Sequence, residues 1–287
     1  METLNERRRA VAVPGAELAV YEFGPEPGPG VSSLLLVHGY PDDHRVFLPA
    51  IRELAQTHHV VAYDTRNAGA SAVQGPGGDY SLNALVDDAF AVLAGVGARA
   101  VHLVGHDWGS IQGWAVIQDP RAGSRIARYT SISGPDLGHF ARWIRRRVRK
   151  PGAWQQLGGQ LLRSWYIGAF LVPVLPEAAW RLLLTPRYEK TAKRDVGNDP
   201  VRGLALYRSN FRFNFRRPRN RPAPNRVTMP VHVVVPLKDP FLAPALVEGL
   251  ETWVDDLTVT RVDSGHWWPA TRPAEFAALL RQPQTTP

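Results

Sequence analysis

The sequence contains no cysteine, which excludes disulfide bonds, thiolate metal sites and a cysteine nucleophile. It also lacks any run near the roughly 20 uncharged apolar residues that a membrane-spanning helix needs. The N-terminal stretch METLNERRRAVAV carries arginines, but the apolar segment of a signal peptide does not follow them. We therefore expect a cytoplasmic protein.

Acidic residues are scarce in one part of the chain. Residues 140–226 hold 20 Lys and Arg against 4 Asp and Glu, a net charge of +16, whereas the remaining residues hold 14 against 22, a net charge of −8. The total of +8 is by itself typical of proteins that bind nucleic acid or anionic lipid. The basic character therefore belongs to an internal segment rather than to the whole chain. At 287 residues, the chain is long enough for one large α/β domain or for a core with an insertion.

Short runs of Leu, Val and other apolar residues recur along the chain, bounded by Gly, Pro or Asp. They lie at 18–23, 33–38, 59–63, 100–104, 128–132, 231–235 and 258–262. Apolar runs without alternation suit strands that are buried on both faces. Stretches with helical period lie between them. Ser81 is a predicted N-cap for a helix through Leu93, and Thr271 with Pro273 opens a last helix that ends near Leu280. The alternation predicts an α/β fold with a mostly parallel sheet flanked by helices.

Residues 137–226 interrupt this alternation, because they are rich in Arg, Trp and Leu and show no convincing strand. We predict a helical cap here, inserted between core segments 1–136 and 227–287. Within it, the sequence FARWIRRRVRK predicts a helix with one apolar face, formed by Phe140, Trp143, Ile144 and Val148. That face either packs on the core while the arginines stay in solvent, or lies at an anionic membrane surface.

The stretch LVGHDWGS at 103–110 has the spacing of the strained turn between a strand and a helix that presents a nucleophilic serine. Its middle position holds Asp107, for which a helix N-cap is the alternative role. Further along come Asp239 and His266, each just after a predicted strand, in the chain order nucleophile, acid, histidine. Asp239 could instead belong to a simple turn, and His266 could cap the last helix. Their order after successive strands favours a catalytic triad.

Five segments resemble the α/β-hydrolase superfamily, in the branch that contains epoxide hydrolases and haloalkane dehalogenases. They are HGYP at 38–41, DTRNAGAS at 64–71, GHDWGS at 105–110, the loop around Asp239 and SGHWWP at 264–269. The resemblance covers essentially the whole chain. Asn67 departs from the family, which usually has glycine there. The segment SISGPDLGHF at 131–140 and the basic cap most resemble actinobacterial epoxide-hydrolase-type domains, some of which are fused to a short-chain dehydrogenase.

A carboxylate nucleophile restricts the electrophile. Attack on an ester or amide carbonyl would give an anhydride, whereas attack on a saturated carbon bearing an epoxide oxygen or a halide gives an ordinary alkyl ester. Asp107 therefore argues against esterase, lipase and protease activity. His266, oriented by Asp239, would then deprotonate a water that attacks the ester carbonyl. The resemblance implies that the backbone N–H groups of Tyr40 and Trp108 stabilise the resulting oxyanion.

An opened epoxide needs a proton donor, whereas a departing halide needs only N–H donors around it. The resemblance implies two such donors from the cap. Tyr166 lies in a Y-x-x-x-F-x-x-P setting, and Tyr207 precedes an arginine, although Leu206 replaces the family's tryptophan. The alternative is that both rings are simply buried in the cap with their hydroxyls in water. Dehalogenases often carry Asn where Tyr40 stands, so Tyr40 favours epoxides.

We predict an epoxide hydrolase that forms vicinal diols from a small hydrophobic, lipid-like epoxide, with Trp108 and Trp267 contacting the substrate. The alternatives are a haloalkane dehalogenase with the same nucleophile and, from another class, an inactive hydrolase-fold scaffold or an anionic-surface binding module. We expect no metal or organic cofactor, because no pair of the remaining histidines has metal-ligand spacing. Those histidines are interpreted as surface or packing residues: His44, His58, His59, His102, His106, His139 and His232.

The basic cap also suggests where the protein acts. An anionic membrane surface is the expected partner besides the substrate, with peripheral association. No nucleic-acid partner is expected, because the arginines lack a recognisable binding fold. The oligomeric state is not predicted.

Overall fold

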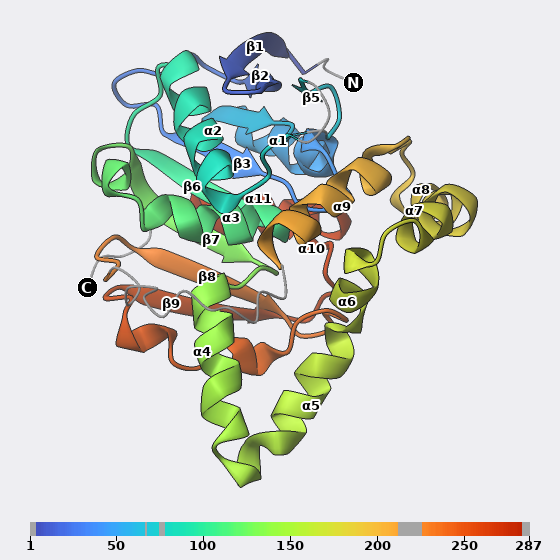
Figure 1. Cartoon of the computed structure of the whole chain (residues 1–287). Coiled ribbons are helices and arrows are strands. Elements are labelled where there is room, and N and C mark those ends of the chain that lie inside the picture. The colour runs from blue at the N-terminus through green and yellow to red at the C-terminus, as the bar shows by residue number, and fades with distance from the viewer. Residues whose placement is uncertain (1–3, 67, 75–77, 212–225, 283–287) are drawn as a thin grey trace.

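The computed structural model describes residues 4–66, 68–74, 78–211 and 226–282 (Figure 1). These residues form a nine-stranded sheet in the order β1-β2-β4-β3-β6-β7-β8-β9, with β5 paired to β2. The strands are β1 Arg7–Val13, β2 Ala16–Phe23, β3 Ser33–Val37, β4 His59–Tyr63, β5 Ala72–Val73, β6 Val101–His106, β7 Ile126–Ile132, β8 Val231–Pro236 and β9 Leu257–Val262. Neighbouring strands are parallel from β4 to β9, and β1 and β2 pair in antiparallel fashion. The predicted α/β fold with a mostly parallel sheet is confirmed.

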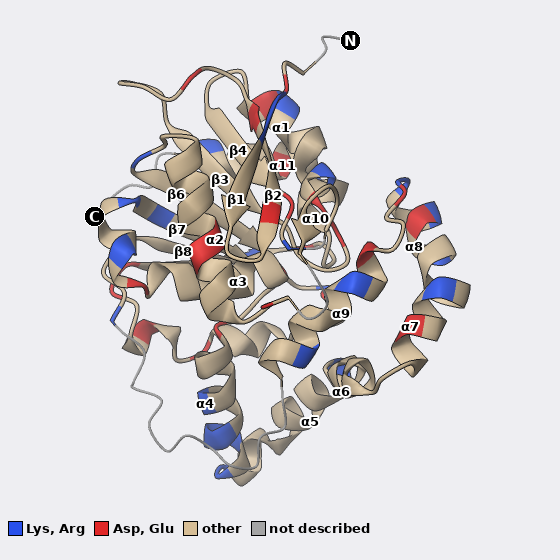
Figure 2. Ribbon diagram, turned by 45° about the horizontal axis from the view of Figure 1, so that its top comes forward, with Lys and Arg blue, Asp and Glu red and all other residues tan. Residues whose placement is uncertain are grey.

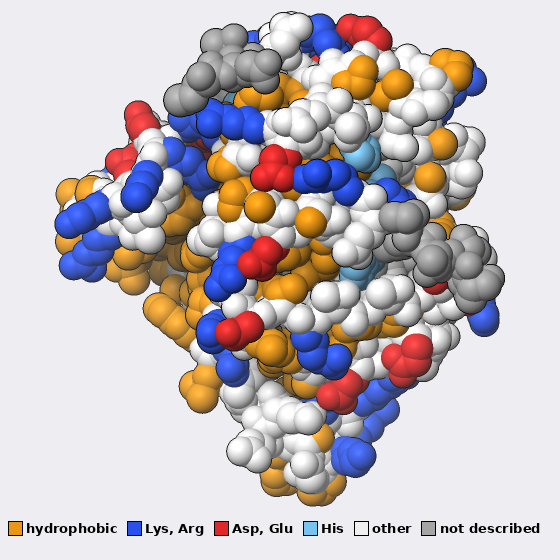
Figure 3. All heavy atoms as spheres, turned by 180° about the vertical axis from the view of Figure 1, so that it is seen from behind, with side chains coloured by type: hydrophobic (Ala, Val, Ile, Leu, Met, Phe, Trp, Pro, Cys, Tyr) orange, Lys and Arg blue, Asp and Glu red, His pale blue; other side chains and the backbone are white. Residues whose placement is uncertain are grey.

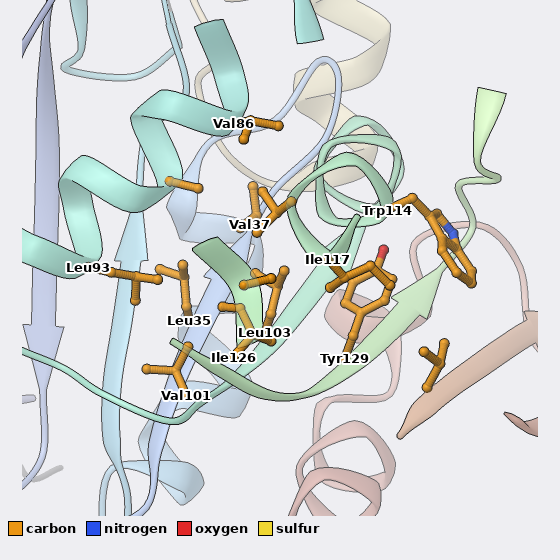
Figure 4. Close-up of a cluster of buried hydrophobic side chains, with 14 of the residues drawn as sticks. Leu35, Val37, Val86, Leu93, Val101, Leu103, Trp114, Ile117, Ile126 and Tyr129 are labelled. Atoms are coloured by element: carbon orange, nitrogen blue, oxygen red, sulfur yellow. The ribbon is translucent and has the colours of Figure 1, made fainter. Parts of the chain in front are cut away.

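The sheet carries helices on both faces, which explains the apolar runs in its strands. In β3, Leu35 and Val37 belong to the core under α2 (Leu82–Gly95) and α3 (Trp108–Ile117) (Figure 4). The intervening side chains of β3 belong to the other core, under α1 (Leu48–Leu54) and α11 (Pro273–Arg281). Successive side chains of a strand point to opposite faces, so a strand between two helical layers needs apolar residues throughout.

Strand β1 and the start of the last helix differ from the sequence predictions, whereas the start of α2 agrees with them. Strand β1 was not expected, because its first three residues are arginines and it is an edge strand paired with β2. Ser81 caps α2 as predicted, with its hydroxyl accepting from the N–H of Ala84 at 3.3 Å. Thr271 does not cap the last helix. It ends α10 (Trp268–Thr271), and its hydroxyl donates to the carbonyl of Trp267.

The insertion between β7 and β8 is helical in its described part, and no strand occurs in residues 137–211. Its helices are α4 Leu137–Val148, α5 Trp154–Arg163, α6 Trp165–Leu171, α7 Leu175–Ala179, α8 Thr185–Ala192 and α9 Asp199–Asn210, with a π-helical turn at Trp180–Leu184. In Figure 1, α4 and α5 project beyond the sheet, and α9 lies back beside the core. The first helix of the insertion begins at Leu137, and the residues before the predicted boundary at 226, 212–225, lie outside the described ranges.

Helix α4 buries a different face from the one predicted. Trp143 is buried as expected and donates from its indole nitrogen to the carbonyl of Ala245 at 2.7 Å. Val148 is 55% exposed, and Arg147 is buried in its place, with its guanidinium 3.7 Å from the centre of the Trp143 ring and 2.6 Å from Glu248. Helix α4 therefore packs on the core through Trp143 and Arg147, which agrees with the first interpretation for Trp143 but not for Val148 or for the expectation that the arginines stay in solvent.

The described helices are short relative to the thickness of a bilayer. None of them alone is long and apolar enough to cross a membrane, whereas α6 and the segment Leu175–Ala192 meet the criterion as a pair, bent by 107°.

Candidate active site

Asp107 lies in the turn between β6 and α3, at the carboxyl end of the sheet. Its φ of 54° is a conformation that costs a non-glycine residue free energy. Two glycines make the turn possible. A side-chain carbon on Gly109 would lie 2.0 Å from the carbonyl oxygen of Val37, and one on Gly105 would lie 2.4 Å from that of Gly109. The Asp107 side chain makes no capping hydrogen bond to α3, so the alternative role as a helix cap is not supported.

Asp239 and His266 follow β8 and β9 and meet Asp107 in one chain of contacts. His266 Nδ1 lies 2.9 Å from Asp239 Oδ2, and its Nε2 lies 3.5 Å from Asp107 Oδ2. The other Asp239 oxygen accepts from the backbone N–H groups of Phe241 at 2.8 Å and Leu242 at 3.2 Å. The side chains of Asp239 and His266 are almost fully buried, whereas the side chain of Asp107, which lines the cavity, is 14% exposed. The carboxylates therefore hold the imidazole from both sides.

Burial and the two carboxylates act against each other on the histidine. Burial lowers the pKa of His266, but its hydrogen bonds and charge interactions with Asp107 and Asp239 outweigh burial and raise that pKa to about 9. For Asp239, burial raises the pKa, and the contacts with His266 and the N–H of Phe241 outweigh it, so the pKa is lowered. A protonated His266 thus depends in part on the negative charge of Asp107.

The loop after β3 presents Tyr40 to the candidate nucleophile. The backbone N–H of Tyr40 donates to Asp107 Oδ1 at 2.7 Å. Its hydroxyl donates to the carbonyl of Pro200 in α9 at 2.7 Å, so the cap holds this side chain in place. Trp108 is the first residue of α3, and a first helical N–H has no acceptor within its own helix. The N–H of Tyr40 therefore contacts Asp107, and Trp108, the second donor that the resemblance implies, follows Asp107 in the chain.

Tyr166 in α6 and Tyr207 in α9 lie next to each other, with ring centres 6.0 Å apart. Both line a cavity together with Asp107, Trp108 and His266. Burial, followed by the charge of Asp107, raises the pKa of Tyr166. The pKa of Tyr207 is raised by burial, then by Tyr166 and Asp107. Both phenols therefore keep their protons at neutral pH.

The rest of the cavity wall is largely apolar, and most of its members could not be predicted from local sequence patterns. Its apolar members include Ile111, Leu137, Phe140, Ile167, Phe211, Phe241 and Leu242. They come from both core and cap, so only the folded chain brings them together. Of this group, sequence reasoning singled out only Phe140, as part of an amphipathic helix.

Trp267, the other predicted substrate contact, is not among the residues that line this cavity. Its indole N–H donates to Asp42 Oδ2 at 2.9 Å, and its ring packs against Phe241 and Tyr188. Asp42 is buried and also accepts from the hydroxyl of Tyr188 and pairs with Arg194. Sequence reasoning missed this hub, because its cap partners are far from Asp42 in the chain.

The described residues contain one group that could hold a metal ion, formed by Asp43, His44 and Asp64, whose ligand atoms lie within 4.8 Å of one another. Protein donors already use these atoms. Arg45 pairs with both oxygens of Asp43, at 3.0 and 2.6 Å, and Asp64 accepts from His44 Nδ1 at 2.7 Å and from a tyrosine hydroxyl. The group ties together the loops after β3 and β4, which agrees with the packing role predicted for His44. Asn67, in the second of these loops, lies outside the described residues.

Comparison with known proteins places this geometry in context. Residues 34–279 match the model of the alpha/beta hydrolase family. The chain is 30% identical over 297 aligned residues to a protein of Mycobacterium tuberculosis named "Probable oxidoreductase EphD", covering 98% of this chain and 50% of that protein. The mouse protein "Epoxide hydrolase 3" is 25% identical over 266 residues, which cover 85% of this chain and 68% of its own length. The chain thus spans about half the length of the mycobacterial relatives, which fits the expected occurrence of fused relatives.

Solved structures of similar fold carry related names. One, described as novel epoxide hydrolases from metagenomes of hot environments, superposes with a TM-score of 0.76 at 25% identity and covers 97% of this chain and 98% of its own. A second, an epoxide hydrolase of Bacillus megaterium in complex with an inhibitor, has a TM-score of 0.73 at 23% identity and covers 95% of this chain and 98% of its own. The second likeness supports the fold alone.

Proposed function

Because this chain belongs to the alpha/beta hydrolase family, we propose that it hydrolyses epoxides to vicinal diols through an ester on Asp107. The observation that carries the proposal is the pairing of a carboxylate at the nucleophile position with two buried phenols, Tyr166 and Tyr207, across one cavity. A serine hydrolase has no use for that pairing, whereas epoxide opening needs both parts. The epoxide hydrolases among the relatives support the same reaction.

In the first step, an Asp107 oxygen attacks a ring carbon of the epoxide. The carbon–oxygen bond of the ring breaks, and its electron pair stays on the epoxide oxygen. Tyr166 or Tyr207 gives that oxygen a proton, which leaves a hydroxyalkyl ester on Asp107 and a phenolate in the cap. Raised phenol pKa values suit this role, because the proton stays on the tyrosine until the stronger alkoxide base forms.

In the second step, a water attacks the carbonyl carbon of the ester while His266 takes its proton. Esterification has removed the charge of Asp107, and with it one cause of the raised pKa of His266, so the imidazolium first gives its proton to the cap phenolate and the neutral imidazole then acts as the base. The N–H groups of Tyr40 and Trp108 stabilise the oxyanion. Collapse of the tetrahedral intermediate breaks its bond to the diol oxygen, which takes up the proton of the newly formed Asp107 carboxyl group. The diol leaves, and Asp107 is again a carboxylate beside a protonated His266.

Mass spectrometry of the His266→Gln variant tests this mechanism and its nearest alternative. The variant lacks the base for the second step, so the ester should accumulate on the peptide that contains Asp107. An adduct from an epoxide supports the proposal, and an adduct from a haloalkane alone identifies a dehalogenase. Asp107→Ala serves as the control and should form no adduct. No adduct from either substrate, together with no turnover by the wild-type protein, would leave an inactive scaffold.

We also propose that the substrate is hydrophobic and lipid-like, and that the protein meets it at an anionic membrane surface. The apolar wall of the cavity supports the first part. The net charge of +16 on residues 140–226 supports the second. The packed face of α4 means that another part of the cap must contact the lipid.

A further inference from the structure

Large apolar side chains are exposed along one stretch of the cap. Those above one-third exposure in the described residues are Val148, Trp154, Leu161, Leu162, Trp165, Val172, Val174, Leu175, Leu182, Leu183, Leu184 and, outside the cap, Leu237. Leu162, Leu182 and Trp165 are 76%, 75% and 71% exposed. Exposed apolar patches of this kind mark interaction surfaces.

These side chains follow the outer edge of the molecule. Helices α5 to α8 form that edge in Figure 1, away from the sheet. Seen from behind, hydrophobic side chains gather along the left edge of the molecule, where the same helices lie (Figure 3). We call the exposed apolar side chains between Trp154 and Leu184 the cap ridge.

Cations accompany the cap ridge. Residues 145–193 contain ten Lys and Arg against two Asp and Glu, a net charge of +8. Figure 2 shows Lys and Arg on α4 and on α8, at the two ends of this segment. One of the two acids, Glu177, is already paired with Arg208 at 2.6 Å. Exposed cations on the cap include Arg149, Lys150, Arg163, Arg181, Arg187 and Lys190.

We propose that the cap ridge docks on an anionic lipid bilayer. Exposed Trp and Leu side chains flanked by Lys and Arg are what an interfacial segment needs, because the apolar groups insert while the cations contact anionic headgroups. A second copy of this chain is a poorer partner, since a symmetric contact through the ridge would bring like charges together. Nucleic acid would neutralise the positive charge of the cap but would leave the exposed leucines of the cap ridge in water.

The cap ridge is continuous with the wall of the active-site cavity. At the start of α6, Ser164, Tyr166 and Ile167 line the cavity, whereas Trp165 between them is exposed. A bilayer that covers Trp165 would therefore lie within about one helix diameter, roughly 10 Å, of Tyr166. Docking would bring the cavity to a lipid-dissolved epoxide. This part of the inference depends on the proposed function, whereas the binding itself does not.

Co-sedimentation with vesicles tests the docking. The full chain is mixed with vesicles of phosphatidylglycerol and phosphatidylcholine, or of phosphatidylcholine alone, and the bound fraction is measured at low and high salt. We expect binding to the anionic vesicles that weakens with salt. Leu162→Glu and Leu182→Glu should each weaken it by about tenfold or more, because each removes one inserted leucine and adds an anion. Leu237→Glu is the matched control, since it makes the same change at an exposed leucine outside the ridge.

Turnover of a water-soluble epoxide, measured on the same samples, separates the two proposals. Retained turnover with lost vesicle binding in the ridge variants supports docking. Vesicle binding without turnover would overturn the proposed function and leave the docking intact. The docking is overturned if the wild-type protein ignores anionic vesicles, or if Leu162→Glu and Leu182→Glu bind as well as Leu237→Glu. It is also overturned if the ridge variants dissociate a wild-type dimer that itself does not bind lipid.

Discussion

At the scale of single residues, the charge state of His266 links the active site to stability. Its pKa is raised from 6.5 to about 9 in the folded protein, so between these values the folded state holds more protons than the unfolded state. The stabilisation is fully present below pH 6.5 and is lost as the pH rises through about 9. Urea unfolding of the wild-type protein and of His266→Gln should therefore give a difference in unfolding free energy that shrinks between these pH values. A difference independent of pH would contradict the raised pKa.

Removing the hydroxyl groups of the two cap tyrosines distinguishes a role in proton donation from a role in packing. Tyr166→Phe and Tyr207→Phe should each lower kcat for an epoxide by about tenfold, because the other phenol remains, and the double variant should lose about 10²- to 10⁴-fold. Tyr80→Phe is a suitable control, since Tyr80 packs in the same apolar cluster without lining the cavity. Steady-state kinetics measures all four proteins. Equal small losses of kcat in every variant would show that both tyrosines contribute only through packing.

Sequence order was enough to propose Asp107, Asp239 and His266, because parallel strands bring the loops at their carboxyl ends together. The structure places these three side chains in contact. It could not be predicted that Trp267 turns away from the cavity toward Asp42. That choice depends on a buried acceptor far away in the chain, which no local pattern reveals.

At the scale of elements, Asp42 fastens the cap to the core. It follows β3, and its donors come from the cap, through Tyr188 and Arg194, and from Trp267 next to the catalytic histidine. Asp42→Asn would leave the guanidinium of Arg194 buried without its anion, so we expect a loss of about 3 kcal/mol of unfolding free energy. Arg194→Met should cost less, because Tyr188 and Trp267 still donate to the carboxylate. Chemical denaturation measures both. The reverse order of losses would show that the ion pair is not the main contact.

The strands were easier to predict than the cap helices, for a physical reason. A strand buried on both faces must be apolar throughout, so its sequence shows its position directly. Helix α4 instead buries Arg147, which is stabilised by the ring of Trp143 and by Glu248. An apolar stripe cannot reveal a buried cation whose anionic partner, Glu248, lies on another part of the chain. The sequence suggested a membrane surface for the cap from its charge and its Trp and Leu residues, but not which of those side chains α5 to α8 leave exposed, because exposure depends on how the helices pack.

At the scale of the whole molecule, the separation of charge between cap and core should affect which epoxides arrive fastest. Residues 140–226 carry a net charge of +16 and the rest of the chain carries −8, and the cavity lies between the two regions. A positive field over the entrance raises the rate of association of anionic ligands, and salt screens it with a Debye length of about 10 Å at 0.1 M. For an epoxide that bears a carboxylate, kcat/KM should therefore fall by about tenfold between 10 mM and 0.5 M salt. For a neutral epoxide of the same length, kcat/KM should change by less than about twofold under the same conditions, because the substrate has no charge for the field to act on.

The double variant Arg181→Ala/Lys190→Ala removes two exposed cations that lie far from the triad in sequence. It should flatten the salt dependence of kcat/KM for the anionic substrate and leave that of the neutral substrate unaltered. Parallel salt dependences for the two substrates would mean that the basic cap does not steer the substrate, and would leave lipid contact as the remaining role of its charge.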